Sequence, residues 1–359
     1  MQKTLRTTLR LILFFAFGFM LLWLLYHNHQ KAYAADCLLK GISISDCSLL
    51  DKLQADFAEL NYLWIWCALV CYGLSNLSRA IRWKMLLLPM GYNPRLRNAF
   101  FTTIVGYLSN LALPRFGEVA RAGSLARYEG IPIEKAVGTI VVDRVADLFM
   151  ILGITVLGLA IEFENIAALA RKYIRPGERF GNQTIILLSL GAALAVFLGW
   201  WFRRRLSRLA IFQTLSHLAD GFLSGLRSIR NIRSKSRFLL HTLLIWLMYF
   251  LMTYMTLLSF HVTANLTLSA ALVVFILGAW GIVVPSPGGM GTYHFMTQVG
   301  LAVYGIGLDD GFSWANISFF TMQIGGTLLY GAFSLACLPL LNRGYQPAAP
   351  VAYGLPERG

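Results

Sequence analysis

Long apolar stretches alternate with short polar ones along the whole chain. Six of them approach the roughly 20 residues that a helix needs to cross a hydrocarbon core of about 30 Å. These are residues 9–26, 62–78, 137–161, 184–202, 238–260 and 314–341. The pattern predicts an all-α, polytopic integral membrane protein with about six full spans.

Two further apolar segments are interrupted before they can cross. Residues 98–113 lead into Pro114 and Gly117, and residues 268–284 lead into the Pro- and Gly-rich segment 285–291. A broken helix is tolerated in lipid only where protein or water satisfies its free backbone groups. We therefore expect two re-entrant hairpins, the first near 98–129 from the cytoplasmic side and the second near 268–306 from the outside. Two short full spans would also suit the charge content of the second.

The two halves of the chain share one order of elements. Residues 62–161 and 238–341 each contain a span, a broken hairpin and a span, but they start on opposite sides of the membrane. Inverted repeats with broken helices are a transporter plan in which the breaks form the binding site. The symmetry rests on hydropathy and on the breaks, since no residue-level repeat supports it.

Charge sets the expected orientation. Of the 359 residues 57% are hydrophobic and 13% charged, yet the net charge is +14. Basic residues gather in 79–97 and 203–237, and acidic residues in 27–61 and 307–313. This asymmetry follows the positive-inside rule and places both termini in the cytoplasm. The excess positive charge therefore indicates topology and attraction to anionic membrane lipids, and no nucleic-acid partner is expected.

These observations divide the chain into successive segments. They are an anchor span in 1–30, expected to stay uncleaved, an outer loop 31–61, repeat 62–161, a span with a basic interfacial helix in 184–237, repeat 238–341 and a cytoplasmic tail 342–359. The amphipathic part of the interfacial helix, 206–229, suits packing on the protein equally well. Cys37 and Cys47 lie in the outer loop, where a disulfide would fit an oxidising compartment.

Ionisable side chains surround the first break. Arg115, Glu118 and Arg121 flank it, and the polar Asn110 precedes it. Because a guanidinium is a planar fork that binds phosphate through two hydrogen bonds, Arg115 and Arg121 are candidate anion contacts. Alternatively, Arg121 pairs with Glu118, three residues earlier, as a structural clasp.

Three more ionisable residues lie inside the predicted span 137–161. Asp143 and Asp147 share one helix face, and Arg144 is adjacent. Charged groups at this depth are costly and normally face a bundle interior or a cavity. We expect either a substrate-binding cluster, with Arg144 as a further anion contact and the carboxylates positioning arginines or exchanging protons, or a purely structural ion network.

The second break carries small and polar residues. Prolines force the preceding residues out of helix, and glycines permit positive φ and close backbone approach. The helix that restarts there points free N–H groups at the break, a favourable place for an anion. The alternative is a plain loop between two spans. The substrate-binding residues expected here are Pro285, Ser286, Gly288, Gly289, Gly291 and His294.

The sequence matches one enzyme signature in part but lacks most of its metal-binding carboxylates. Gly117, Ala120, Arg121 and Gly130 match part of the CDP-alcohol phosphatidyltransferase pattern. That chemistry needs four carboxylates to hold metal ions, and only Glu134 occupies one of the four positions. No catalytic residue, metal site or cofactor is predicted.

In these motifs the chain resembles the lysylphosphatidylglycerol synthase transmembrane region, also called the flippase-like domain family. The resemblance covers about residues 55–340. Its pieces are Ser78-Arg-Ala-Ile-Arg-Trp83, then Asn110, Pro114, Gly117, Glu118, Arg121 and Ala122, then Asp143, Arg144 and Asp147, then Pro285-Ser-Pro-Gly-Gly-Met-Gly291. The family often has an acidic residue shortly after the last piece, where this chain has Tyr293 and His294.

The resemblance implies a protein of the bacterial cytoplasmic membrane that moves or binds an anionic phospholipid or a lipid-linked headgroup. No aminoacyl-transferase domain is seen in the sequence, so lysine transfer to lipid is not expected. Two alternatives stay open. One is a small-solute or ion transporter, and the other is a scaffold for a separate lipid- or glycan-modifying enzyme.

Overall fold

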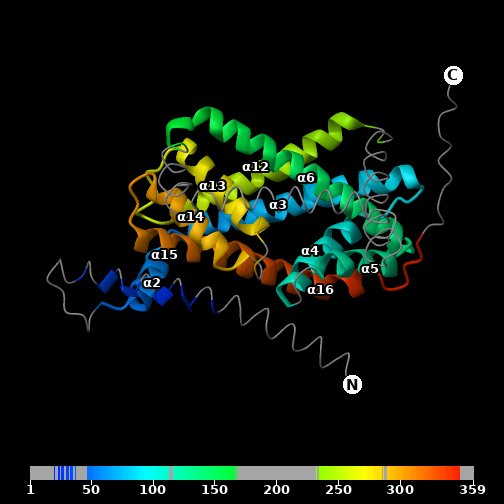
Figure 1. The fold of residues 1–359 in the computed structure, drawn as a ribbon. Helices are drawn as coiled ribbons and strands as arrows, with labels where there is room; N and C mark the ends of the chain where they lie inside the picture. Colours follow the sequence, from blue (N-terminus) through cyan, green and yellow to red (C-terminus); the bar gives the residue numbers. More distant parts are fainter. Residues whose placement is uncertain are drawn as a thin grey trace, which may run out of the picture.

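The computed structural model describes residues 47–112, 116–165, 234–284 and 289–347, together with 167, 232, 286 and single positions between 20 and 37. The predicted spans 9–26 and 184–202 and the amphipathic stretch 206–229 therefore lie outside its continuous part. All elements in the four ranges are helical, as expected (Figure 1). In order they are α2 (Leu49–Ala58), α3 (Tyr62–Leu87), η2 (Leu88–Met90), α4 (Leu96–Ala112), α5 (Gly117–Glu129), α6 (Ile133–Ile161), α12 (Lys235–Ser259), α13 (Leu268–Val283), α14 (Thr292–Ala302), α15 (Leu308–Phe319), η4 (Phe320–Gly326) and α16 (Thr327–Leu341).

Three described helices are long and apolar enough to cross a membrane. They are Ile133–Ile161, Lys235–Ser259 and the continuous run Leu308–Leu341, which includes the π-helical turn η4. A fourth is obtained when Leu49–Ala58 and Tyr62–Met90, bent by 82°, are taken together. The four predicted spans that fall in the described ranges correspond to these helices. The protein is thus an integral, multi-pass membrane protein by helix length and composition.

The first interrupted segment is an antiparallel hairpin of α4 and α5. The start of α4 meets the end of α5, where Asn98 Nδ2 donates to Glu129 Oε1 at 2.5 Å. Asn98 Nδ2 also donates to Asn342 Oδ1, just beyond α16, at 2.9 Å. The hairpin therefore opens at the end of the bundle where α16 ends (Figure 1).

The second interrupted segment is a hairpin of α13 and α14. A Cβ built on Gly281 would meet Tyr293 Cα at 2.8 Å, and one on Gly300 would meet Val274 Cα at 3.5 Å, so the two helices pack closely and antiparallel. Gln298 Nε2 donates to the carbonyl oxygen of Leu308 at the start of α15. This hairpin thus opens at the opposite end of the bundle, near α2 and α15 (Figure 1).

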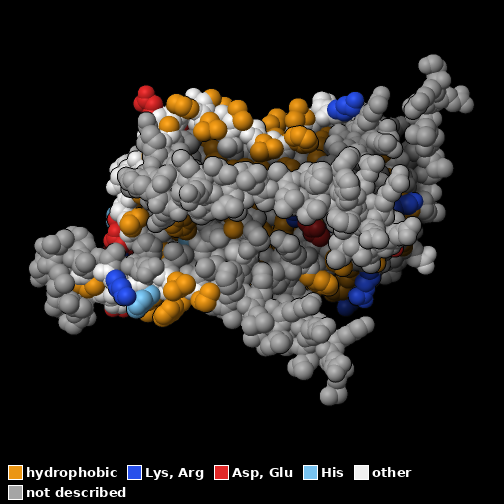
Figure 2. Space-filling model, in the orientation of Figure 1, with side chains coloured by type: hydrophobic (Ala, Val, Ile, Leu, Met, Phe, Trp, Pro, Cys, Tyr) orange, Lys and Arg blue, Asp and Glu red, His pale blue; other side chains and the backbone are white. Residues whose placement is uncertain are grey.

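Apolar side chains cover one flank of the bundle. Figure 2 shows a hydrophobic band along the upper edge, over α6 and α12, with acidic side chains at one end and basic ones at the other. Phe149 and Val156 of α6 and Leu240 of α12 are more than half exposed. Such exposure would be costly in water and suits a lipid-facing surface.

The short helix α2, which is bent by 82° from α3, is fixed to the start of α15. Lys52 Nζ donates to Asp310 Oδ1 at 2.7 Å and to Asp56 Oδ2 at 2.8 Å. Cys37 and Cys47 form a disulfide, and Gln30 bonds to the backbone at Cys47 and Leu49. The predicted outer loop therefore contains a cross-linked element.

Candidate functional site

The site is built around α3, which extends further than the sequence indicated. The sequence predicts a span that ends at residue 78 and a basic segment 79–97 outside it, but α3 continues through Arg79 and Arg82 to Leu87. Leu86, Leu87 and Trp83 are buried, so their burial holds this last part of the helix in the bundle. Arg79 and Arg82 are 2% and 0% exposed, so their side chains lie inside the bundle.

These two arginines bind both carboxylates of α6. Arg79 Nη1 donates to Asp143 Oδ2 and to Asp147 Oδ2, each at 2.8 Å. Arg82 donates from Nε to Asp143 Oδ1 at 2.7 Å and from Nη2 to Asp147 Oδ1 at 2.8 Å. A pair of arginines three apart on one helix thus matches a pair of aspartates four apart on another.

Hydroxyl groups of α12 complete this lattice. Arg79 Nη2 donates to Tyr249 Oη, and Arg82 Nη1 donates to Thr242 Oγ1, both at 3.2 Å. Buried charges are tolerated only when they are paired and hydrogen-bonded. In the Arg79–Arg82–Asp143–Asp147 lattice every charge is paired, and Arg79 Nε is the one donor of its two arginines that is buried without a partner among the described residues. The lattice joins α3, α6 and α12.

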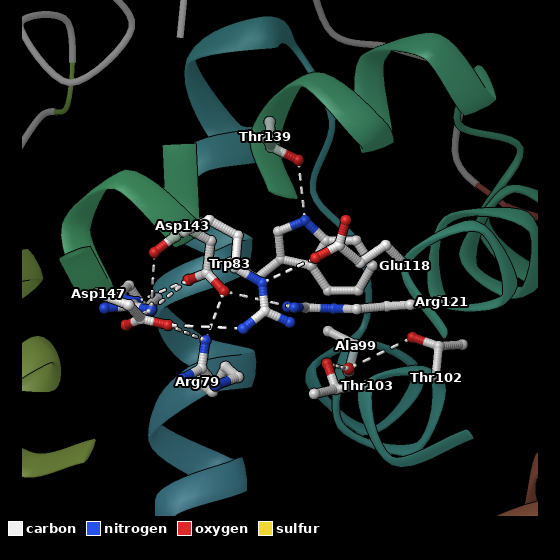
Figure 3. A network of polar contacts seen from close by, with 12 residues as sticks. Arg79, Trp83, Ala99, Thr102, Thr103, Glu118, Arg121, Thr139, Asp143 and Asp147 are labelled. Atoms are coloured by element: carbon white, nitrogen blue, oxygen red, sulfur yellow. Dashed lines mark hydrogen bonds and ion pairs between the residues drawn. The ribbon is translucent and has the colours of Figure 1, made fainter. Parts of the chain in front are cut away.

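Arg121 of α5 is a third arginine at this lattice, bound more weakly. Its Nη1 lies 3.4 Å from Asp143 Oδ2, and its guanidinium stacks 3.9 Å from the centre of the Trp83 ring. Trp83 is itself fixed by donating from Nε1 to Thr139 Oγ1 at 2.8 Å. Figure 3 shows Arg121 reaching across Trp83 toward Asp143.

The remaining donors of Arg121 face no acceptor. Its Nε and Nη2 are buried and have no hydrogen-bond partner among the described residues. Together, Arg121 and the lattice contain three arginines and two aspartates. Their formal charges sum to +1. An unsatisfied buried donor is costly, and an anion that accepted from it would remove that cost.

The break between α4 and α5 brings Arg121 into place. A Cβ on Gly106 would meet the Gly117 carbonyl oxygen at 2.7 Å, and a Cβ on Gly117 would collide with Gly106 and Asn110. Asn110 Oδ1 accepts from the backbone N–H of Gly117 at 2.7 Å. Asn110 thus caps the start of α5, and the two glycines let the helices touch.

Glu118 and Arg144 form a pair at the edge of the site, and Arg144 Nη1 also approaches Asp147 Oδ2 of the lattice at 4.0 Å. Arg144 Nε donates to Glu118 Oε1 at 2.9 Å, and both side chains are nearly half exposed. The expected alternative in which Arg121 pairs with Glu118 is therefore wrong, because Arg121 turns to Asp143. Arg144 follows Asp143 in sequence but projects from a different face of α6.

A small cavity of about 10 Å³ lies between this pair and Arg121, lined also by Thr103, Tyr107, Asn110 and Gly117. A single water needs roughly 10–15 Å³ of such space. The cavity is therefore too small for a phosphate-bearing headgroup, which could reach Arg121 only if α4 and α5 moved apart from α6.

The second group of predicted residues lies at the α13–α14 hairpin. Gly289 and Gly291 adopt φ of 84° and 80°, as expected for the break. Ser286 Oγ lies 2.8 Å from Thr292 Oγ1, which donates to the Gly281 carbonyl oxygen at 2.6 Å. His294 is buried beside Phe312 and Phe319.

The structure thus brings together the predicted residues Asn110, Glu118, Arg121, Asp143, Arg144 and Asp147. Within the described ranges no hydrogen bond or ion pair links them to Ser286, Gly289, Gly291 or His294. Arg115, Pro285 and Gly288 lie outside the described residues. Arg79 and Arg82 belong to the Ser78–Trp83 motif of the family resemblance, but their charge was assigned to membrane topology and not to the site.

Comparisons with known proteins agree with the motifs. The family described as the lysylphosphatidylglycerol synthase TM region matches residues 48–329. The UPF0104 membrane protein MJ1595 of Methanocaldococcus jannaschii is 30% identical over 114 residues, which are 30% of this chain and 34% of that protein. The match therefore spans about a third of the length of this relative. No solved structure gives a significant match.

Proposed function

This chain belongs to the family of lysylphosphatidylglycerol synthase transmembrane regions, and we propose that it binds and moves an anionic phospholipid, or a lipid-linked anionic headgroup, between membrane leaflets. The role is transport rather than catalysis. The observation that carries the proposal is Arg121, a buried cation at a helix break with two unsatisfied donors.

The charge of the site favours an anionic headgroup. Arg79 and Arg82 already neutralise Asp143 and Asp147, so Arg121 supplies the unbalanced charge. A phosphate oxygen that approached Nε and Nη2 would accept both hydrogen bonds in the forked geometry that arginine prefers. Its acyl chains would stay in the hydrocarbon while only the headgroup entered the protein.

Because the cavity beside Arg121 is closed, transport would require the α4–α5 hairpin to move. The α4–α5 contact is made by small residues, and the Glu118–Arg144 pair at its edge is half exposed and individually weak. Separating Glu118 from Arg144 would open a path to Arg121 and would leave the bonds of Arg79 and Arg82 to Asp143 and Asp147 in place. The α13–α14 hairpin, which opens at the other end of the bundle, would supply the opposite path if the two halves form an inverted repeat.

Orientation and location are part of the proposal. We propose that the protein lies in the inner membrane of a bacterial cell, and the basic residues at the open end of the α4–α5 hairpin support a cytoplasmic location for that end. Both termini would then be cytoplasmic. A small solute as cargo, or a partner enzyme for which the chain is a scaffold, are the competing functions that the experiment must separate.

A leaflet assay tests the proposal. Vesicles that contain the purified chain and a trace of headgroup-labelled phosphatidylglycerol are treated with an impermeant quencher. The protein should let label from the inner leaflet reach the quencher, and Arg121→Gln should slow this about tenfold or more. Arg127→Gln is the matched control, because Arg127 is an exposed arginine of the same helix. Equal rates in protein-free vesicles would contradict the proposal, and solute uptake without lipid movement would replace it with the solute-transport function.

A further inference from the structure

A second lipid contact is suggested by a groove on the outside of the bundle. It has a volume of about 480 Å³ and lies between α3, α4 and α16. Small-molecule sites typically occupy about 300–1,000 Å³. Its lining is aliphatic and aromatic, including Leu74 and Leu77 of α3 and Phe100 and Phe101 of α4.

One small residue shapes the floor of this groove. A Cβ on Gly73 would meet the hydroxyl oxygen of Tyr330 at 2.6 Å, so only glycine lets the tyrosine lie against α3. Tyr330 Oη donates to the Leu69 carbonyl oxygen at 3.0 Å. The polar end of the phenol is therefore satisfied, and the groove keeps an apolar floor.

The groove has a single charged residue in its lining, Arg97. Arg97 lies in the first turn of α4, where its positive charge interacts unfavourably with the helix dipole. The dipole of α4 therefore does not explain an arginine at this position. It is exposed and donates from Nη2 to the Leu341 carbonyl oxygen at 3.1 Å. No carboxylate of the described residues pairs with it, so most of its five N–H donors are available.

We propose that this groove binds an acyl chain of an anionic phospholipid whose phosphate is held by Arg97. The lipid belongs to the leaflet at the basic end of the bundle. In hydrocarbon an apolar groove gains nothing from the hydrophobic effect, so selection must come from shape and from the charged end. The guanidinium can bind the phosphate of a phospholipid, and the apolar groove beside it can hold one acyl chain of the same molecule. The site is separate from Arg121 and does not depend on transport.

Photolabelling of the full chain tests this site. The protein is reconstituted in phosphatidylcholine vesicles with a trace of phosphatidylglycerol that carries a photoreactive diazirine on one acyl chain. Labelled peptides should come from α3 near residues 70–77 and from α4 near 100–101. Arg97→Gln should lower that labelling about tenfold, as should filling the groove with Leu74→Trp. The matched controls Arg237→Gln and Leu240→Trp change an exposed cation and an exposed leucine of α12 and should leave it unchanged.

Three results would overturn the proposal. One is equal labelling of the groove by the same probe on a phosphatidylcholine headgroup. Another is labelling that Arg97→Gln does not reduce. The third is no labelling of the groove helices at all, which would mean that another part of the protein or a second copy covers them. Because the readout needs no lipid movement, each result is distinct from failure of the leaflet assay.

Discussion

Arg121 approaches Asp143 at 3.4 Å, between Nη1 and Oδ2, while Arg79 binds the same oxygen at 2.8 Å. Of the three arginines that share Asp143, Arg121 is thus the one held most loosely. It is also the one that sits on a broken hairpin rather than on a long helix. Arg79 and Arg82 are therefore interpreted as structural, and Arg121 as the arginine that could release Asp143 and bind another anion.

The first prediction concerns stability. Arg79→Gln should destabilise the folded protein by about 3–5 kcal/mol, because it leaves buried carboxylates short of a partner. Arg121→Gln should destabilise it less, since Asp143 keeps Arg79 and Arg82. Glu118→Gln should change stability by about 1 kcal/mol or less, because its ion pair is half exposed. Thermal unfolding midpoints in one detergent would rank the three variants, and an equal loss for Arg79→Gln and Arg121→Gln would contradict this division.

The second prediction concerns the contact between α4 and α5. Gly117→Ala should force the helices apart and cost about 1–3 kcal/mol, because its Cβ would overlap Gly106 and Asn110. Gly123→Ala in the same helix should be neutral or slightly stabilising, since nothing lies within 4 Å of its Cβ. The measurement is the unfolding midpoint together with lipid movement. If both variants behaved alike, close packing at the break would not matter.

Much of the fold was visible in the sequence, for identifiable reasons. Proline and glycine at 114–117 and 285–291 predicted the two hairpins because they act on the backbone locally. Arg79 and Arg82 were not assigned to the site because basic residues after an apolar run indicate membrane topology. Their three-residue spacing was a signal, but it gains meaning only when Asp143 and Asp147 are seen on the facing helix.

A second difference from the sequence prediction concerns the side chains of Asp143 and Arg144. Asp143 and Arg144 are adjacent in sequence, and they were both expected at the substrate. In a helix adjacent residues point about 100° apart, so Asp143 turns to the lattice while Arg144 turns to Glu118. Sequence alone could not decide which of the two faced the interior.

The third prediction concerns pH. Burial works against the charged form of Lys52, but hydrogen bonds to Asp310 and Asp56 outweigh it and raise the pKa of Lys52 above its usual 10.5. A raised pKa in the folded state means that the stabilisation is complete below pH 10.5 and is lost as pH rises through the folded-state value. Lys52→Met should therefore lower the unfolding midpoint at pH 8 and lower it less above pH 10.5. A deficit that stayed constant over this range would contradict the role of the charge.

The fourth prediction concerns topology. The Cys37–Cys47 disulfide should form in cells because the predicted outer loop faces an oxidising compartment. Alkylation of the unreduced protein should then spare both cysteines, and alkylation after reduction should modify them. Free thiols at both positions in protein from cells that support disulfide formation would instead place the loop on the reducing side.

The pairing of a lipid phosphate with Arg121 can be measured directly by solid-state NMR. Protein with ¹³C,¹⁵N-labelled arginine is placed in phosphatidylglycerol bilayers, and dephasing of guanidinium signals by ³¹P is recorded. A buried guanidinium signal that dephases should be lost in Arg121→Gln and kept in Arg127→Gln. If Arg121→Gln left every dephasing signal in place, no phosphate would lie at the helix break, and the proposed headgroup site would be wrong.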